Sequence, residues 1–407
     1  MKSRIAAIIL ATGASVVSAV DVSDVVVQQR WPWSRLIDVE FVIDGEAGAG
    51  ARYDVTLTAR NGTEELTVPS AAISGDVGPL AAGVHTLTID PVAAGFTQDV
   101  MTRFNVTVAA SNSPAYMIVD LATGAKTYNY DWSQLMDVSD ATYKTDKMVF
   151  KHVPAGTFNM GCVPPSGAFQ STSMTSHVVR LTKDYWLGVY EVTQTQWYNL
   201  METWPSYFTN LADRAYRPVE SVTFAQVRGN WNIARFSSPV TSFMGVFASR
   251  SGLSADVPTE AQIEYAMRAG DSGNWYKEAN TNAKLVDHAR VQDNSGGYTY
   301  NSNTTQDLQN IPISTGGTAA VGSFAANDWG FYDMCGNVWE MCYDGAGYAD
   351  HTGPKVDPVH ALISNTIEIH GGCFNSYYQW ANNGARSSSS KASWGIGFRV
   401  MAEYEVK

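Results

Sequence analysis

The chain has 407 residues, of which 45% are hydrophobic, so it is long enough to form two domains with a sizeable core. It is acidic, with 27 Lys and Arg against 39 Asp and Glu and a net charge of -12. Because phosphate neutralisation needs clustered cations and the chain has no basic run, nucleic acid is not expected as a partner.

Residues 1–19 are typical of a secretory signal peptide. Lys2 and Arg4 precede an apolar run from Ile5 to Val20, and residues 17–19 supply the small side chains at which a signal peptidase cuts. The run is too short for a membrane-spanning helix, and no later segment reaches about 18 uncharged apolar residues. We therefore expect a bacterial protein that is secreted, periplasmic or held at the cell surface, and that is not embedded in a membrane.

Export would place the four cysteines in an oxidising compartment, where disulfides persist. They are Cys162, Cys335, Cys342 and Cys373. Four cysteines allow three complete pairings, and the sequence does not choose among them. We favour Cys335 with Cys342, because they flank a compact loop, unless strain forbids the bond. The absence of a CxxC pair argues against a zinc site or a thioredoxin-type centre.

Residues 20–112 alternate between apolar and polar side chains, which predicts half-buried strands. The period of two is clearest at 37–43, 53–57, 86–89 and 104–108. Asn61-Gly62 stands where a two-residue turn would join two strands. We predict an antiparallel β-sandwich of the immunoglobulin or fibronectin-III type, without the antibody disulfide because the segment lacks cysteine. Its role does not follow from its fold.

Residues 113–147 carry no sustained period and are interpreted as a connector, within which residues 116–121 would form a short strand. From residue 148 to residue 407, long periodic segments are few. Two capping boxes, each a Thr followed three residues later by Gln, predict helices that begin after Thr193 and Thr259. The rest is rich in Gly, Asn, Ser and Trp, which indicates a loop-rich second domain.

The stretch WGFYDMCGNVWEMC, which begins at residue 329, combines aromatics and cysteines with oxygen-bearing side chains. In one interpretation, the carboxylates of Asp333 and Glu340 and the carbonyls of Gly336 and Val338 enclose a hard cation such as calcium. In the other, Asp333 and Asn337 satisfy their own turns and Glu340 faces water. The spacing lacks the regular oxygen pattern of an EF-hand loop and leaves both interpretations open.

The stretch resembles the signature GLYDMxGNVWEW of the formylglycine-generating enzyme family, also called the sulfatase-modifying factor family. Further matches follow in order: VPAGTFNMG (153–161), GVYEVTQTQ (188–196), RPVESV (217–222), PTEAQIEYAMRAG (258–270), Gly371-Gly372 and Gly397-Phe398-Arg399. The resemblance implies an α+β class, with an irregular domain related to C-type lectins over residues 148–407. It also implies a structural calcium held by Asp333, Gly336, Val338 and Glu340.

Family members that oxidise a sulfatase cysteine use two cysteines that hold copper, in a pattern close to GGSYxCxxxxC. Here Cys373 follows Gly371-Gly372 at the place of the family's serine, and the two cysteine positions fall on Ser376 and Ala381. No cysteine follows Cys373 in any register. Because Cu(I) prefers soft thiolate ligands, copper is not expected. We assign no catalytic residue, and Cys373 is the one thiol near the family's active site.

The segment from Cys373 to Ile396 has the composition of a binding surface, since 15 of its 24 residues are Tyr, Ser, Asn, Gly or Trp. In the family this region lines the substrate groove, and in relatives diversified by retroelements it varies. The candidate ligand-binding residues are Asn375, Ser376, Tyr377, Tyr378, Trp380, Asn382, Asn383, Arg386 and Trp394. The alternative is a solvated loop over core aromatics.

Three functional hypotheses remain open. The first is an exported, non-catalytic family member that binds a peptide, protein or glycan. The second is a divergent formylglycine-generating or related metal-dependent oxidoreductase that acts on an exported substrate. The third is a ligand-binding protein diversified by a retroelement.

Overall fold

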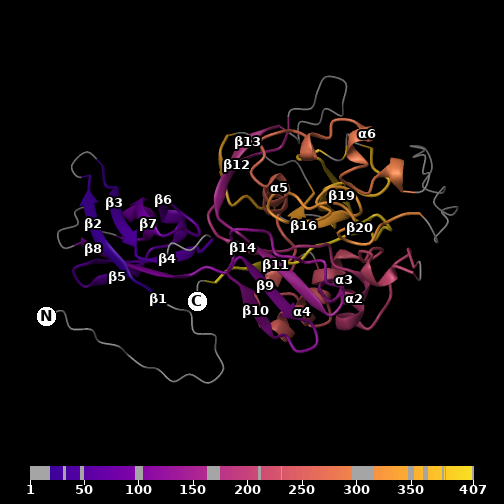
Figure 1. Ribbon diagram of the computed structural model, residues 1–407, viewed down its shortest axis with the longest axis horizontal. Helices are drawn as coiled ribbons and strands as arrows, with labels where there is room; N and C mark the ends of the chain where they lie inside the picture. Colours follow the sequence, from indigo (N-terminus) through magenta and orange to yellow (C-terminus); the bar gives the residue numbers. More distant parts are fainter. Residues whose placement is uncertain are drawn as a thin grey trace. The chain divides into compact units, whose positions relative to one another are not determined.

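The computed structural model describes residues 19–30, 34–45, 50–96, 104–162, 175–209, 212–230, 232–295, 316–346, 353–360, 365–377, 380 and 382–405 (Figure 1). The chain divides into two compact units, one up to Ser113 and one from Pro114 to Glu405. The predicted signal peptide, apart from its last residue, lies outside the described residues. Among the described residues, no helix is long and apolar enough to cross a membrane.

The first unit contains two four-stranded antiparallel sheets. One has the order β1-β8-β4-β5, with β1 (Ala19–Val20), β8 (Phe104–Asn112), β4 (Tyr53–Asn61) and β5 (Glu64–Thr67). The other has the order β2-β3-β7-β6, with β2 (Val22–Gln29), β3 (Ile37–Ile43), β7 (Gly83–Ile89) and β6 (Ile73–Gly75). A short helix, α1 (Pro91–Ala94), follows β7.

The period of two in the sequence decides which side chains of this unit form its core. Every second residue of β3 is fully buried, from Ile37 to Ile43, and β7, β4 and β8 add their own alternate residues to the same hydrophobic cluster. The predicted strands and the predicted hairpin are therefore confirmed. In that hairpin Asn61 pairs with Glu64, and Gly62 has a φ of 65°, which favours glycine. The immunoglobulin or fibronectin-III type remains a prediction.

The second unit mixes helices with three sheets. The six-stranded sheet has the order β10-β9-β11-β14-β21-β15, with β10 (Lys126–Asn129), β9 (Tyr116–Asp120), β11 (Lys147–Val153), β14 (Tyr185–Gly188), β21 (Met401–Glu403) and β15 (Ala255–Asp256). The three-stranded sheet joins β12 (Gly156–Met160), β13 (His177–Leu181) and β17 (Lys355–Val356). The four-stranded sheet has the order β19-β18-β16-β20, with β19 (Arg386–Ser389), β18 (Ile367–His370), β16 (Trp339–Gly345) and β20 (Ile396–Gly397).

Two of the five helices in the described part of the second unit begin at the caps that the sequence predicts. The five helices are α2 (Gln194–Met201), α3 (Phe224–Arg228), α4 (Phe243–Ser251), α5 (Glu260–Arg268) and α6 (Asn282–Leu285). Both predicted capping boxes, at Thr193 and Thr259, are confirmed, and a third one at Thr223 opens α3. α2 and α3 contact α4, while α5 contacts the strands β12, β13, β16 and β18 (Figure 1).

Aromatic side chains tie these helices to the end of the chain. Trp197 of α2 stacks on Phe243 of α4 with ring centroids 5.4 Å apart, and Phe243 meets Phe398 edge-on at 5.0 Å. Phe398 belongs to the predicted Gly397-Phe398-Arg399 motif. That motif therefore begins inside the core of the second unit and leads directly to Arg399.

Residues 113–147 were predicted to be a connector, but nearly all of them belong to the second unit. Pro114 begins the second unit, and two strands of this segment, β9 and β10, join the six-stranded sheet through pairing of β9 with β11. The strand suggested at residues 116–121 is present as β9. The lack of a sustained period misled the prediction, because this strand is buried along most of its length and so does not alternate.

The favoured disulfide between Cys335 and Cys342 is wrong. None of the four cysteines, all of which lie in the described part of the chain, forms a disulfide, and all four are buried. The side chains of Cys335 and Cys342 belong to one hydrophobic cluster, where each thiol fills space between apolar neighbours as a small hydrophobic group.

Candidate functional site

The signature stretch forms a tight loop that enters β16. Asp333 and Asn337 have φ values of 54° and 57°, and the glycine between them, Gly336, has a φ of 79°. A side chain at Gly336 would meet the Arg290 carbonyl oxygen at 2.4 Å, so this position requires glycine. The backbone of Gly336 also donates to the Gly371 carbonyl over 2.9 Å. The loop is thus held against the Gly371-Gly372 motif by its own backbone.

Glu191, from the GVYEVTQTQ match, lies at the centre of this loop. It is fully buried and accepts hydrogen bonds from Asn337 Nδ2 at 2.6 Å and from the Val338 backbone at 3.1 Å. Asn337 Oδ1 in turn accepts from the Ala319 backbone at 2.8 Å. Asn337 therefore links two segments instead of capping its own turn. Sequence reasoning missed Glu191 as a site residue, although the motif match contained it.

Arg399 supplies the positive charge that faces Glu340. Its Nε and Nη2 donate to the two Glu340 oxygens at 3.0 and 2.8 Å, and both side chains are buried. The same guanidinium donates to the Gly188 and Tyr332 carbonyls, each at 2.8 Å. The interpretation in which Glu340 faces water is therefore wrong. Four motif matches that lie far apart in the sequence meet at one buried cluster.

The charge of this cluster fits a hard divalent cation. Glu191, Asp333 and Glu340 are buried together, and the cations that act on them are Arg399 and, for Asp333, the half-buried Lys144. Burial raises the pKa of Asp333 to about 6. Burial also raises the pKa of Glu191 well above its usual range, and the two neighbouring carboxylates raise it further. The donors are oxygen atoms, as calcium requires.

Glu340 keeps the capacity to bind a cation while it is paired with Arg399, because a carboxylate offers about four lone pairs. Asp333 uses one oxygen to accept from the Gly322 backbone at 2.6 Å. The predicted ligands Asp333, Gly336, Val338 and Glu340 lie within one short loop, and the atoms that they would offer are oxygens, the donor type that calcium prefers. A bound calcium there would be enclosed by protein, which is typical of a structural ion.

Cys373 is the one thiol close in sequence to Ser376 and Ala381, which stand at the positions of the family's two copper-binding cysteines. It is buried, its thiol donates to Asn375 Oδ1 at 2.8 Å, and its backbone donates to Ser376 Oγ at 2.9 Å. Burial raises the pKa of Cys373 to about 11. In the absence of a metal the thiol is therefore protonated at neutral pH, and it lacks the thiolate that a nucleophile needs.

Four of the predicted ligand-binding residues point into the protein. Asn382 Oδ1 accepts from the Cys162 thiol, and Asn383 Nδ2 donates to the Gly273 carbonyl. Arg386 Nη1 donates to both oxygens of Glu260 at 2.8 and 2.9 Å, and Ser376 receives the bond from Cys373. Because these four side chains are buried and bonded to other parts of the protein, they support the surface residues and do not contact a ligand in this conformation.

The other predicted residues remain at the surface. Asn375, Tyr377, Trp380 and Trp394 are partly exposed, and Tyr378 lies outside the described residues. Trp394 packs on Phe374 with ring centroids 5.0 Å apart, and Phe374 meets Phe208 edge-on at 5.0 Å. We call Asn375, Tyr377, Trp380 and Trp394 the aromatic surface. It consists of three partly exposed rings and one amide side chain, and of these Trp394 packs on the buried ring of Phe374.

Comparison with known proteins adds a sequence relationship to this geometry. The sequence pattern of the sulfatase-modifying factor enzyme 1-like domain matches residues 134–404. The formylglycine-generating enzyme of Streptomyces coelicolor is 33% identical over 160 residues, which are 37% of this chain and 47% of that enzyme. The chain thus spans about half the length of that relative.

Two further proteins share more of their length with this chain. The chaperone protein LppX of Paenibacillus barcinonensis is 26% identical over 199 residues, which cover 44% of this chain and 69% of LppX. The solved structure of Treponema denticola variable protein 1 aligns with 63% of this chain and 96% of its own chain, with a TM-score of 0.47 and 22% identity.

Proposed function

We propose, from the premise that this chain belongs to the sulfatase-modifying factor enzyme 1-like family, that it is an exported, non-catalytic member of that family. Its function would be to bind a peptide or protein through the aromatic surface. A glycan is the second ligand class that this chemistry would accept, because flat rings stack on both kinds of ligand. One relative is named a chaperone protein, which is a protein-binding role.

The state of Cys373 carries the non-catalytic proposal. Copper oxidases of this family need a pair of reactive thiolates, whereas this chain has Ser376 and Ala381 at the paired positions. The thiol that remains is buried, hydrogen-bonded to Asn375, and protonated at neutral pH because burial raises its pKa to about 11. A soft metal would therefore find one unreactive sulfur at this position.

An oxygen-uptake assay separates the binding proposal from the oxidoreductase alternative. The purified chain, loaded with Cu(I) and supplied with a cysteine-containing sulfatase peptide and a reductant, is expected to consume no oxygen above the copper blank. An active formylglycine-generating enzyme in the same assay provides the positive control. Turnover that is abolished by Cys373→Ser would instead support the oxidoreductase.

A peptide display library and a glycan array test the binding proposal directly. We expect enrichment of ligands from the peptide library, and we expect Tyr377→Ala to weaken their binding about tenfold or more, as loss of an aromatic anchor does. Tyr198→Ala is the matched control, since Tyr198 is 41% exposed on α2 and lies outside the aromatic surface. Equal losses in both variants would contradict the proposal.

We further propose that Asp333, Gly336, Val338 and Glu340 hold calcium, which would fix the signature loop. Calcium is expected to raise the melting temperature and a chelator to lower it, because a ligand at 100 times its Kd stabilises by about 2.7 kcal/mol. Asp333→Asn should remove this dependence, and Asp271→Asn, at an exposed acid elsewhere, should keep it. A melting temperature that changes with neither calcium nor chelator would refute the calcium site.

A further inference from the structure

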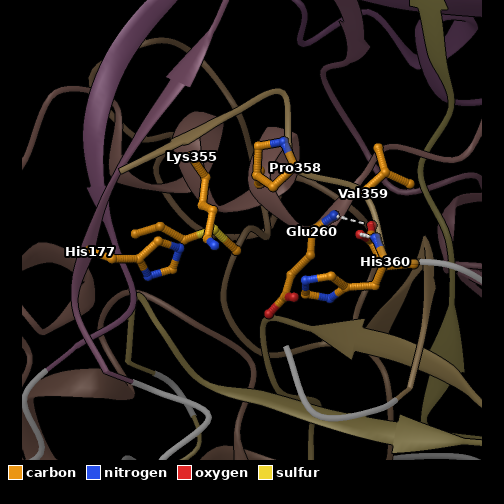
Figure 2. A pocket seen from close by; sticks show the side chains of 9 residues that line it. His177, Glu260, Lys355, Pro358, Val359 and His360 are labelled. Carbon is orange, nitrogen blue, oxygen red and sulfur yellow. Dashed lines mark hydrogen bonds between the residues drawn. The ribbon is translucent and has the colours of Figure 1, made fainter. Parts of the chain in front are cut away.

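A cavity of about 230 Å³ in the second unit is lined by side chains of both charges. Figure 2 shows His177 and Lys355 on one side of it and Glu260 on the other. Asp344 adds a second carboxylate to the lining. Because acids and bases stand together there, the lining does not select the charge of a ligand. A charge that no described residue matches lies elsewhere in the same unit, at Arg214.

Arg214 forms no hydrogen bond and no ion pair with any residue that the structure describes. It begins the short 3-10 helix η4 (Arg214–Tyr216) and is partly exposed. Its Nε is buried without a hydrogen-bond partner, whereas its two Nη groups are open to solvent. A buried N–H without an acceptor destabilises the folded state, and native structures contain few such groups. The guanidinium is therefore held in place by something other than hydrogen bonds.

The rings of Trp204 and Tyr198 hold this guanidinium. Its central carbon lies 3.9 Å from the centre of the Trp204 ring. Tyr198 stacks on Trp204 with ring centroids 4.6 Å apart and planes 15° apart. Two groups so close to one ring lie on its opposite faces, since a single face has no room for both. Trp204 is thus enclosed between Tyr198 and Arg214, and cation–π attraction fixes the guanidinium without using its N–H donors.

The segment that carries Trp204 is anchored on both sides. Thr203 Oγ1 accepts a hydrogen bond from Trp197 Nε1 at 3.0 Å, and the Phe208 backbone donates to Glu220 Oε1 at 2.9 Å. Trp204 is nevertheless 40% exposed. Because both of its faces are covered, this exposed part lies mainly at the edge of the indole. The ring is therefore a firm support that keeps an apolar edge in contact with solvent.

Two other arginines stack on aromatic rings in the described part of the chain, and both use their donors within the protein. Arg228 donates to the two oxygens of Asp256 at 2.8 and 2.9 Å. Arg235 Nη2 donates to Gln262 Oε1 at 2.7 Å. Arg214 differs from both, because each of its N–H groups lacks an acceptor among the described residues. Stacking alone therefore does not account for the open donors of Arg214.

Neither of the acids close in sequence forms an ion pair with Arg214. Asp213 accepts from Arg217 Nε at 2.7 Å through Oδ1, and Glu202 is exposed to solvent. The chain as a whole carries a net charge of -12, which repels an anion in proportion to its charge. The site therefore fits a ligand with one negative charge better than one with two, such as hydrogen phosphate.

We propose that Arg214, supported by Trp204, binds the carboxylate group of a small organic monoanion with a flat apolar body. The planar guanidinium presents its two Nη groups side by side, which matches the two oxygens of a carboxylate. The exposed edge of the Trp204 indole contacts the apolar body, of which benzoate is the simplest representative. This site shares no residue with the aromatic surface.

Isothermal titration calorimetry with benzoate and benzamide tests this assignment, since the two probes share their ring and differ in charge. We expect saturable binding of benzoate to the full chain, and binding of benzamide that is at least about tenfold weaker. Arg214→Lys should weaken benzoate binding about tenfold or more, because lysine keeps the charge and loses the paired planar donors. Arg60→Lys is the matched control, because Arg60 is an exposed arginine of the first unit.

Trp204→Leu covers the outcome in which Arg214→Lys fails to fold. Trp204 is exposed and its segment is anchored by its neighbours, so the change should be tolerated. Without the indole the guanidinium is no longer held flat, and benzoate binding should again weaken about tenfold. The proposal is overturned if the wild-type chain does not bind benzoate, if benzamide or inorganic phosphate binds as tightly, or if neither variant lowers the affinity relative to Arg60→Lys. None of these results bears on the aromatic surface.

Discussion

At the residue scale, Lys151 shows how burial and aromatic contacts oppose each other. It is 8% exposed, and burial lowers its pKa to about 7. Its ammonium lies 4.0 Å from the centre of the Trp132 ring and 4.6 Å from that of Tyr116. These ring faces stabilise the charged form by about 2 kcal/mol when the cation is desolvated. They therefore offset part of the cost of burying the charge.

We expect Lys151→Met to stabilise the protein below pH 7 and to lose that advantage as the pH rises to 10.5. The unfolded chain keeps the Lys151 proton up to pH 10.5, whereas the folded chain releases it near pH 7. The free energy of unfolding of the wild type therefore rises with pH between about 7 and 10.5, because the unfolded chain binds one more proton there. Between pH 7 and 10.5 the stability difference between variant and wild type should shift by about 4–5 kcal/mol in favour of the wild type, measured by urea unfolding. A difference independent of pH would show that Lys151 does not titrate there.

A second residue-scale prediction compares a buried ion pair with an exposed one of similar geometry. Arg399→Met should cost about 3–5 kcal/mol, because it leaves Glu340 buried without its guanidinium. Arg30 binds Asp38 through Nε and Nη2 in the same way, at 2.8 and 2.7 Å, but is solvent-exposed. Arg30→Met should therefore cost less than about 1 kcal/mol. Urea unfolding of both variants measures this ranking, and equal costs would contradict it.

At the scale of elements, short helices begin through local hydrogen bonds. The capping boxes of α2, α3 and α5 each join a Thr side chain to a Gln backbone three residues later and return a bond from the Gln side chain. A box satisfies two of the backbone N–H groups left open at a helix start. Helices of five to nine residues are too short to persist alone, so tertiary packing completes what the caps begin.

The loss of stability on removing a capping threonine should depend on the other hydrogen bonds that its side chain makes. Thr259→Ala should cost about 1 kcal/mol through loss of the cap. Thr193→Ala should cost more, because Thr193 Oγ1 also donates to the Lys144 carbonyl at 2.7 Å and the side chain is fully buried. Thr193→Ser and Thr259→Ser, which keep the hydroxyl, are the controls. Urea unfolding that ranks Thr259→Ala as the costlier change would contradict this account.

At the scale of the whole molecule, each compact unit has its own hydrophobic clusters. The first unit is built around the cluster of β3, β4, β7 and β8, and the second around larger clusters that include α2, α4 and α5. A segment with a complete core of this kind is expected to fold by itself. The family match at residues 134–404 falls in the second unit.

Residues 114–407, expressed without the first unit, should fold and unfold cooperatively. Because β9 belongs to the six-stranded sheet, a second fragment that starts at residue 148 should lose that strand and be much less stable. Circular dichroism and thermal unfolding of the two fragments provide the comparison. A stable fragment from residue 148 would support the original interpretation of residues 113–147 as a connector.

The sequence alone determined the features that depend on near neighbours along the chain. The strands of the first unit follow from alternation, the starts of α2 and α5 from their caps, and the membership of the family from ordered motifs. Each of these signals is local, or is a string that can be matched without knowing its surroundings.

The tertiary structure decided what those residues do to one another. Glu340 meets Arg399 across 59 residues and Asn337 meets Glu191 across 146, and no local pattern encodes such pairings. Burial likewise turned Asn382, Asn383 and Arg386 from ligand-binding candidates into internal partners. A side chain's charge, exposure and partners depend on the groups that folding brings around it, which is why the geometry of the site emerged only in three dimensions.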